Sequence, residues 1–283
     1  MGVTIVRGSQ LGFRSVGPVQ RREIISHELC GAMETCGAIE VFPSNMSGIG
    51  MIEAKYRHHI IYIIEGSGGQ IILKHTDGKY DTQPVLPGAG LYMEPGETFM
   101  IESGDSDFRF LRLTFPSPPA SLVSSVYEPY QGYLFSPDIL PVLSGSAGRV
   151  RTFCVNFGMP PFCKTRSAQA GLMRYGPGSQ SPYHMHLPDP AKGCDLVEHF
   201  YMMFRGNGQV RTEDGYQDVG PEDLVWIPQG VRHQLIASES GLDYFEFQTP
   251  LGFITTMFEV EDTEDARENM RWRTAAGSLW TQS

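Results

Sequence analysis

The sequence lacks the features that place a protein in a membrane or on a nucleic acid. No apolar run approaches the ~18 residues of a membrane-spanning helix, and the start MGVTIVRGSQLGFRSVG lacks the apolar core of a signal peptide. Basic residues number 22 against 32 acidic ones, for a formal charge of −10. This charge disfavours binding to nucleic acid or to an anionic membrane. We therefore expect a cytoplasmic protein whose partner is a small molecule.

Cysteine is sparse and unpaired in pattern. The chain has 5 cysteines, an odd number with no C-x-x-C pair. This argues against a disulfide framework and against a zinc ribbon, so we expect reduced thiols.

Helical patterns are also scarce. Short apolar runs alternate instead with turn residues, and 32 glycines and 20 prolines interrupt the chain at close spacing. Regularly spaced short strands with turn signals are typical of an all-β sandwich or barrel, here with few short helices. At 283 residues, the length allows one large domain or two small ones.

An internal repeat favours two domains. The stretches 59–66 (HIIYIIEG) and 199–206 (HFYMMFRG) each place six residues between a histidine and a glycine. Further on, residues 90–99 (GLYMEPGETF) resemble residues 223–232 (DLVWIPQGVR). Each of the latter is an apolar strand that ends in a proline turn. Two copies of one β-unit account for both halves of the chain.

These repeats predict the domain boundaries. We expect one barrel at 1–116, a proline-rich connector at 117–150 and a second barrel at 151–260. The acidic end, 261–283, has the composition of a short helix. Packing of this tail helix on a barrel or second subunit and full solvation both stay open.

Four histidines near residue 200 have the spacing of metal ligands. His184 and His186 are two apart, so on a β-strand both side chains point to one face. His199 and His233 follow on later strand-like segments. A single histidine is more often a structural residue than a ligand. Four at these spacings indicate a metal site, and imidazole is a ligand that several transition metals accept.

Two neighbouring residues compete for the third ligand position. Glu198 and His199 are adjacent, and consecutive strand residues face opposite sides of a sheet. Counting back from Gly206 selects His199, because the same count recurs between His59 and Gly66. Two residues further, Tyr201 shares this face and offers a hydroxyl as a catalytic acid or base, with barrel packing as the alternative role.

The motifs around these residues resemble those of the cupin superfamily. Its first motif, G-x5-H-x-H-x3-4-E-x6-G, is matched by 178–186 and by 199–206, with histidine in place of glutamate. Its second motif, G-x5-P-x-G-x2-H, is matched by 223–233, although Glu222 stands where the first glycine is usual. The resemblance covers nearly the whole chain, as a bicupin.

This resemblance implies two tandem cupin barrels, each a double-stranded β-helix or jelly roll, and a homodimer. It also implies one divalent metal in the second barrel, with Fe(II) favoured and Zn, Ni and Mn left open. The implied metal ligands are His184, His186, His199 and His233. Twelve residues, 187–198, separate two of them where the family has three or four, and we expect this insertion to shape substrate access.

The first copy lacks a comparable ligand set. By the same alignment its positions read Glu53, Lys55, His59 and a residue near Met100. A lysine ammonium does not ligate, and methionine is a soft ligand. We therefore expect the N-terminal barrel to hold no metal.

Three functions agree with these patterns. Cupins with ligand sets made of histidine resemble dioxygenases, so the leading interpretation is an Fe(II)-dependent dioxygenase, an oxidoreductase acting on a small anionic, oxygen-rich substrate. The first alternative is redox-neutral Lewis-acid catalysis by an isomerase, a polyketide-type cyclase or an aminohydrolase. The second alternative is a non-catalytic bicupin that binds a small ligand.

Overall fold

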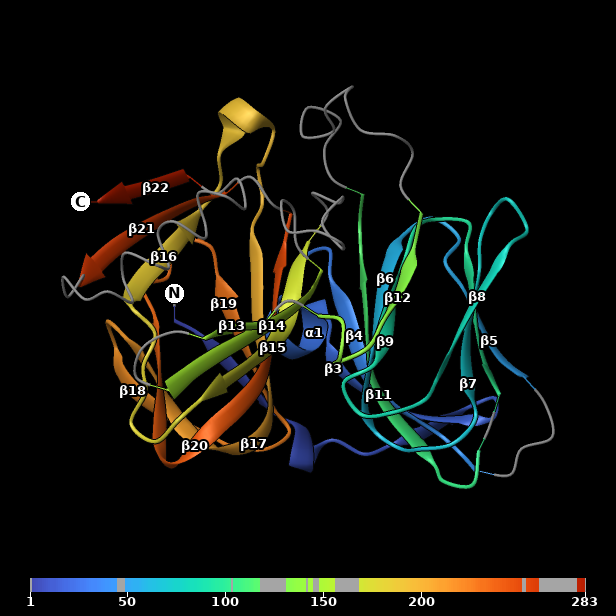
Figure 1. Ribbon diagram of the computed structural model, residues 1–283. Helices are drawn as coiled ribbons and strands as arrows, with labels where there is room; N and C mark the ends of the chain where they lie inside the picture. The colour runs from blue at the N-terminus through green and yellow to red at the C-terminus, as the bar shows by residue number, and fades with distance from the viewer. Residues whose placement is uncertain are drawn as a thin grey trace. The chain divides into compact units, whose positions relative to one another are not determined.

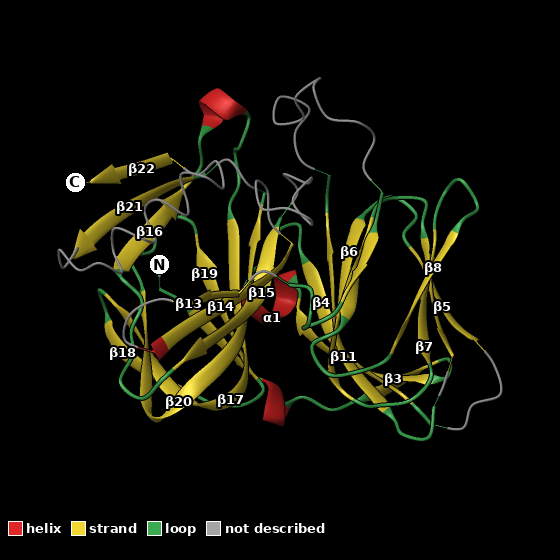
Figure 2. Ribbon diagram, viewed as in Figure 1, coloured by secondary structure: helices red, strands yellow, loops and turns green. Residues whose placement is uncertain are grey.

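The computed structural model shows a chain built almost entirely of β-strands (Figures 1 and 2). The residues that it describes are 2–44, 49–102, 104–117, 131–140, 142–144, 148–155, 168–250, 253–259 and 279–282. They form two compact units, one of which contains 10–117 and 131–140, and the other 2–9 and the described residues from 142 onward. We call them the N-terminal and C-terminal barrels. The expected all-β class with tandem barrels is confirmed.

The N-terminal barrel consists of a seven-stranded and a four-stranded antiparallel sheet. The larger sheet has the order β12 (Tyr133–Phe135), β9 (Gly90–Met93), β6 (His58–Glu65), β11 (Phe108–Phe115), β4 (Cys36–Phe42), β3 (Val19–Ile25) and β2 (Arg14–Val16). The smaller has the order β5 (Ile49–Glu53), β10 (Thr98–Glu102), β7 (Gln70–Lys74) and β8 (Tyr80–Pro84). A single-turn helix, α1 (His27–Cys30), follows β3.

The C-terminal barrel has an eight-stranded and a three-stranded sheet. The larger runs β1 (Thr4–Arg7), β19 (Asp223–Pro228), β17 (Glu198–Thr212), β20 (Gln234–Thr249), β15 (Gln169–Tyr175), β14 (Arg149–Val155) and β13 (Val142–Ser144), and β18 (Gly215–Val219) pairs with β17. The smaller runs β16 (Tyr183–Leu187), β21 (Ile254–Glu259) and β22 (Leu279–Gln282). The described residues also include the short 3-10 helices η1 (Gly8–Gln10) and η4 (Pro190–Lys192).

The strands show an alternation of buried and more exposed side chains. In β11, Phe108 and Phe110 are buried while Arg109 between them is half-buried, as expected for a sheet with one face on a core.

The long strand β17 bends at Gly206, whose φ is +76°. A Cβ atom there would lie 2.1 Å from the carbonyl oxygen of Gly241, so this bend requires glycine.

The two units differ from the predicted domains in two places, the first residues of the chain and the connector. Strand β1 pairs with β19, and Arg7 forms a 2.5 Å ion pair with Asp223, so the first residues complete the C-terminal barrel rather than the 1–116 barrel. The expected connector, 117–150, contributes β12 to one barrel and β13 to the other. The sequence around β1 does not reveal its partner, because an exposed edge of either barrel's sheet could accept an added strand.

Most of the expected tail helix, 261–283, lies outside the described residues. Residues 279–282 of this segment form strand β22, which runs parallel to β21. Within the described part of the chain, no helix is long and apolar enough to cross a membrane.

Candidate metal centre

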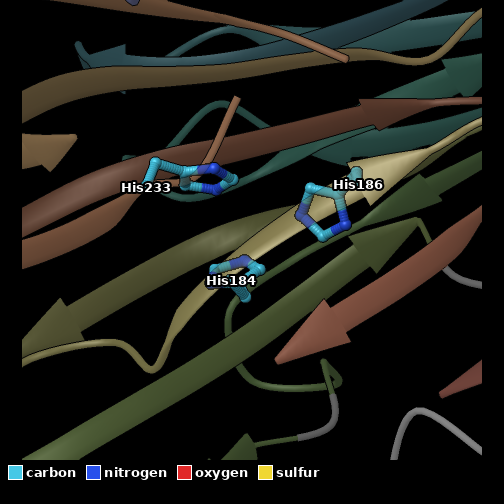
Figure 3. Close-up of side chains that lie close together, drawn as sticks. All are labelled: His184, His186 and His233. Atoms are coloured by element: carbon cyan, nitrogen blue, oxygen red, sulfur yellow. The ribbon is translucent and has the colours of Figure 1, made fainter. Parts of the chain in front are cut away.

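Three of the predicted ligands converge inside the C-terminal barrel (Figure 3). His184 and His186 project from β16, and His233 directly precedes β20. One ring nitrogen of each lies within 4.8 Å of the others, and no ring is more than 2% exposed. The backbones of His184 and His233 exchange two hydrogen bonds, of 3.0 and 2.7 Å. This reciprocal pair holds the two segments, and therefore the rings, in register.

The hydrogen bonds of the rings select the tautomer of two of the three histidines. Each Nδ1 faces an oxygen acceptor: Pro182 O at 2.7 Å, Thr255 Oγ1 at 3.0 Å and Val231 O at 2.9 Å, for His184, His186 and His233 respectively. A backbone carbonyl can only accept, so Nδ1 carries the proton at two of the three rings. At His184 and His233 the Nε2 atom then presents a lone pair. In metal-binding histidines, a hydrogen bond from the ring nitrogen that does not bind the metal orients the ring.

The donor set fits a divalent transition metal. Among the described residues, these three histidines form the group of His, Cys, Asp or Glu side chains whose donor atoms lie close enough to hold an ion. Three neutral imidazoles leave the charge of a dication uncancelled and coordination positions open. Cysteine is absent from the group, unlike in many closed structural zinc sites.

His199 lies beside this group without belonging to it. Its ring centroid is 4.8 Å from that of His186 and 5.2 Å from that of His233, so His199 does face the barrel interior. Its Nε2 atom contacts Glu246 Oε1 at 3.1 Å and Gln248 Nε2 at 3.0 Å. The structure thus pairs the fourth histidine with a carboxylate and an amide. Its role as a fourth metal ligand stays a prediction.

The sequence reasoning missed Gln248 and Glu246. Both lie on β20, where Gln248 pairs with His199 and Glu246 pairs with Tyr201. The Gln248 amide nitrogen is also 3.1 Å from His186 Nε2, so it bridges two of the rings. The missed signal is the alternation around Phe247, since two polar residues at i and i+2 in a buried apolar strand face one interior.

A polar layer lies next to the histidines on the same inner face. Tyr201 is 1% exposed, and its ring centroid lies 4.6 Å from that of His199 and 5.0 Å from that of Tyr244. Burial raises the pKa of Tyr244 well above its usual value, and nearby Tyr175, Glu246 and Tyr201 raise it further. The Tyr201 ring therefore lies next to the candidate metal centre, with its centroid 6.2 Å from that of His233. Its role in acid or base catalysis remains a prediction.

Arg151 completes this layer from β14. Burial alone would lower the pKa of its guanidinium, but the neighbouring Tyr175, Glu246 and Tyr244 outweigh burial and raise it. Glu246 therefore interacts with a cation on one side and with the His199 ring on the other. We call Arg151, Tyr175, Tyr201, Tyr244 and Glu246 the polar layer of the C-terminal barrel.

The insertion 187–198 packs close to the candidate centre. Cys194 and Val197 are buried together with Phe253, whose ring centroid is 4.9 Å from that of His186. Burial raises the pKa of the Cys194 thiol, so this cysteine is a packing residue rather than a nucleophile. The insertion therefore packs against Phe253, which in turn is the apolar neighbour of His186.

The corresponding positions of the N-terminal barrel are apolar, which corrects the sequence alignment. Met93 pairs with His59 as Ile227 pairs with His199. Six residues after Met93 lies Phe99, which pairs with Ile52 as His233 pairs with His184.

The positions that correspond to the two ligands on β16 are therefore Ile52 and Ala54. The sequence reasoning chose Glu53 and Lys55, whose side chains are 52% and 67% exposed. That choice was wrong because a shift of one residue on a strand moves a side chain to the opposite face.

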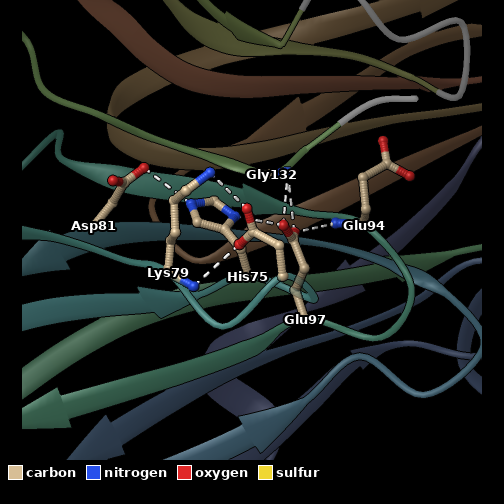
Figure 4. A network of polar contacts seen from close by, with 7 residues as sticks. His75, Lys79, Asp81, Glu94, Glu97 and Gly132 are labelled. Atoms are coloured by element: carbon tan, nitrogen blue, oxygen red, sulfur yellow. Dashed lines mark hydrogen bonds and ion pairs between the residues drawn. The ribbon is translucent and has the colours of Figure 1, made fainter. Parts of the chain in front are cut away.

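A separate buried network ties a connecting segment to the N-terminal barrel (Figure 4). Both Glu97 carboxylate oxygens accept from the Gly132 amide at 3.0 Å, and one of them lies 2.7 Å from His75 Nδ1. The other ring nitrogen of His75 is 3.0 Å from Asp81. The acceptors thus lie on opposite sides of one imidazole and do not converge on a point. This geometry anchors the segment that precedes β12.

Several solved structures have a fold similar to that of this chain. The structure of an oxalate decarboxylase from Lactobacillus farciminis in complex with formate is 13% identical, covers 88% of this chain and 86% of its own, and has a TM-score of 0.65. An oxalate decarboxylase variant from Bacillus subtilis is 13% identical, covers 91% and 80%, and has a TM-score of 0.68. The chain has the bicupin fold.

Two further comparisons concern another solved structure and a family model. The protein Ylba from E. coli, of family DUF861, is 14% identical, covers 88% of this chain and 90% of its own, and has a TM-score of 0.62. A family model described as AraC-like ligand binding domain matches residues 198–257, within the C-terminal barrel. No curated protein matches the sequence. At these identities the likeness establishes the cupin fold, and the chemistry has to be argued from the site.

Proposed function

We propose that this bicupin is a metal-dependent enzyme acting on a small, anionic, oxygen-rich substrate, and that its reaction is an Fe(II)-dependent dioxygenation. The observation that carries this proposal is the convergence of His184, His186 and His233 with their Nδ1 atoms facing oxygen acceptors. These residues would hold the ion. A bound dication would supply Lewis acidity and open positions for an anionic oxygen and dioxygen.

The protein groups around the histidines would position the substrate. The Gln248 amide and the His199 ring lie beside the convergent rings, within hydrogen-bonding distance of each other. Both can contact an oxygen atom of a substrate held at the centre. Phe253 provides an apolar wall at His186, and full burial of all three rings excludes bulk water. A dry site strengthens every electrostatic contact to an anion.

A redox-neutral reaction is the second candidate. Two of the similar structures are oxalate decarboxylases, which supports action on a small carboxylate without net oxidation. The polar layer agrees with this reading, because Arg151 supplies a cation on the inner face of the barrel. The isomerase, cyclase and aminohydrolase alternatives belong to this class.

A non-catalytic role is the third candidate. The family model that matches residues 198–257 is described as a ligand binding domain. In that case the histidine cluster would bind a ligand or contribute to stability, and no substrate would be turned over.

Metal analysis followed by oxygen uptake separates these candidates. The protein as purified is analysed for iron, zinc, nickel and manganese. It is then loaded anaerobically with Fe(II) and exposed to oxygen with enolisable diketones, hydroxylated aromatic acids and oxalate. Oxygen consumption that requires substrate supports the dioxygenase. Turnover that persists without oxygen supports the redox-neutral reaction, and no turnover in either condition supports the binding protein.

Variants show whether the observed activity belongs to this centre. His186→Ala removes one convergent ring and is expected to abolish turnover. His27→Ala changes an exposed histidine and is the matched control. Unchanged turnover in His186→Ala would contradict the assignment of the centre.

A further inference from the structure

The N-terminal barrel contains a cavity of its own, of about 330 Å³. Its walls are mostly apolar and include Phe42, Ile52, Phe99 and Phe110. This volume is at the lower end of the range for pockets that bind small molecules, and such pockets are usually apolar with a few placed polar groups. The positions of Ile52 and Phe99 correspond to two histidines of the metal centre. The cavity therefore lies where a metal site would be in a cupin barrel, and among the residues that line it only Glu40 carries a side chain of a metal-ligand type.

The polar groups of this cavity are charged and come from two adjacent strands. Glu40 on β4 and Arg112 on β11 both line it, and Arg112 Nη2 lies 2.6 Å from Glu40 Oε1. Arg21 Nη1 is 3.7 Å from the same carboxylate oxygen. Two guanidinium groups thus share one carboxylate. The Nε atom of Arg21 is buried and makes no hydrogen bond. The cluster has a net positive charge in an otherwise apolar enclosure.

The nearby histidine does not change this charge at neutral pH. Burial lowers the pKa of His59 to about 4, and the positive charges of Arg112 and Arg57 contribute. His59 is therefore neutral at pH 7. Burial also raises the pKa of Glu40, an effect that Arg112 and Arg21 oppose. An apolar cavity with surplus guanidinium charge favours a ligand with an apolar body and one anionic group.

We propose that the N-terminal barrel binds a small monocarboxylic acid with an aromatic or branched apolar body, whose carboxylate contacts Arg112. The acid's body packs against Phe99, Phe110 and Ile52, and its charge offsets the surplus guanidinium. A planar carboxylate matches the paired donors of a guanidinium group. This binding is independent of the chemistry at the metal centre, since all the residues involved belong to the N-terminal barrel.

Isothermal titration calorimetry with phenylacetate and its neutral isostere phenylacetamide tests this proposal. We expect saturable binding of phenylacetate and binding of phenylacetamide that is weaker by about tenfold or more, because a charged hydrogen bond is lost. Arg112→Gln should weaken phenylacetate binding by a similar factor. His186→Ala, in the other barrel, should leave it unchanged and serves as the matched control.

Several outcomes would overturn the proposal. They are the absence of binding at millimolar phenylacetate, equal binding of the acid and the amide, and loss of binding in His186→Ala. If Arg112→Gln does not fold, as judged by circular dichroism, Ile52→Trp takes its place. This variant fills the cavity without removing a charge, so it must abolish binding, and retained affinity in it would place the ligand elsewhere.

Discussion

The two barrels share a strand pairing but have opposite interiors. Where the C-terminal barrel pairs His184 with His233, the N-terminal barrel pairs Ile52 with Phe99. The first arrangement brings three imidazoles together, and the second lines a cavity with apolar side chains. The shared register determines where a side chain points. The residue type at that position then decides between a candidate metal centre and a candidate pocket for an organic molecule.

Both barrels also carry an arginine on a corresponding strand, with different partners. In the N-terminal barrel Arg21 pairs across β3 and β4 with Glu40. In the C-terminal barrel Arg151 lies on the equivalent strand β14, and the carboxylate near it is Glu246 on β20. The position of the carboxylate differs, so one guanidinium cluster faces the N-terminal cavity while Glu246 connects Arg151 with His199. Small changes in carboxylate placement therefore give related barrels different interiors.

The largest expected effect concerns metal content. His233→Gln should remove a bound divalent metal almost completely, because one of three convergent imidazoles is lost. His59→Gln, at the comparable face of the other barrel, should leave the metal content unchanged. Elemental analysis of both purified variants checks this contrast. Equal metal loss in both variants would contradict the assignment of the centre to the C-terminal barrel.

The next effect is on stability through the apolar interior. Phe99 is 1% exposed, so Phe99→Ala should lower the free energy of unfolding by about 3–5 kcal/mol. Tyr56→Ala removes an aromatic ring that is 86% exposed and should change it by less than about 0.5 kcal/mol. Urea denaturation of both variants measures the difference. A cost for Phe99→Ala as small as that of the control would show that this residue is not part of the core.

A third effect separates buried from exposed ion pairs. Glu40→Gln leaves the guanidiniums of Arg112 and Arg21 without their carboxylate and should destabilise the fold by about 3 kcal/mol. Glu23→Gln breaks a surface pair with Arg14 and should cost less than about 1 kcal/mol. Thermal unfolding compares the two. Phenylacetate should also raise the stability of Glu40→Gln more than that of the wild-type protein, because its carboxylate replaces the one that was removed.

The smallest effect is a pH dependence from the N-terminal barrel. The folded pKa of His59 is lowered from its usual 6.5 to about 4, so between these values the unfolded chain binds a proton that the folded chain does not. The stability from this residue is present above pH 6.5 and is lost as the pH falls toward 4. It amounts to at most about 3 kcal/mol. His59→Gln should flatten the stability profile over this window, and His27→Gln should not.

Much of the site could be predicted from short-range spacing. The i, i+2 pair His184 and His186 defines one strand face, and the proline turn before His233 marks the start of another strand. Both statements rest on the two-residue period of a strand. The same reasoning failed for Glu53 and Lys55, because an error of one residue in aligning two repeats inverts the face. A local pattern can therefore be transferred to the second copy of a repeat only when the strand register of that copy is known.

The remaining parts depend on contacts between distant segments. Glu246 and Gln248 reach the histidines only because β20 pairs with β17, about fifty residues earlier, and β1 joins the C-terminal barrel across more than two hundred. The amino-acid sequence by itself determined the all-β class, the internal repeat and the strand face of the convergent histidines, since these follow from local periodicity. The tertiary structure alone decided which strands pair, and hence which side chains share an interior, because hydrogen-bonded ladders between remote strands carry no local signature.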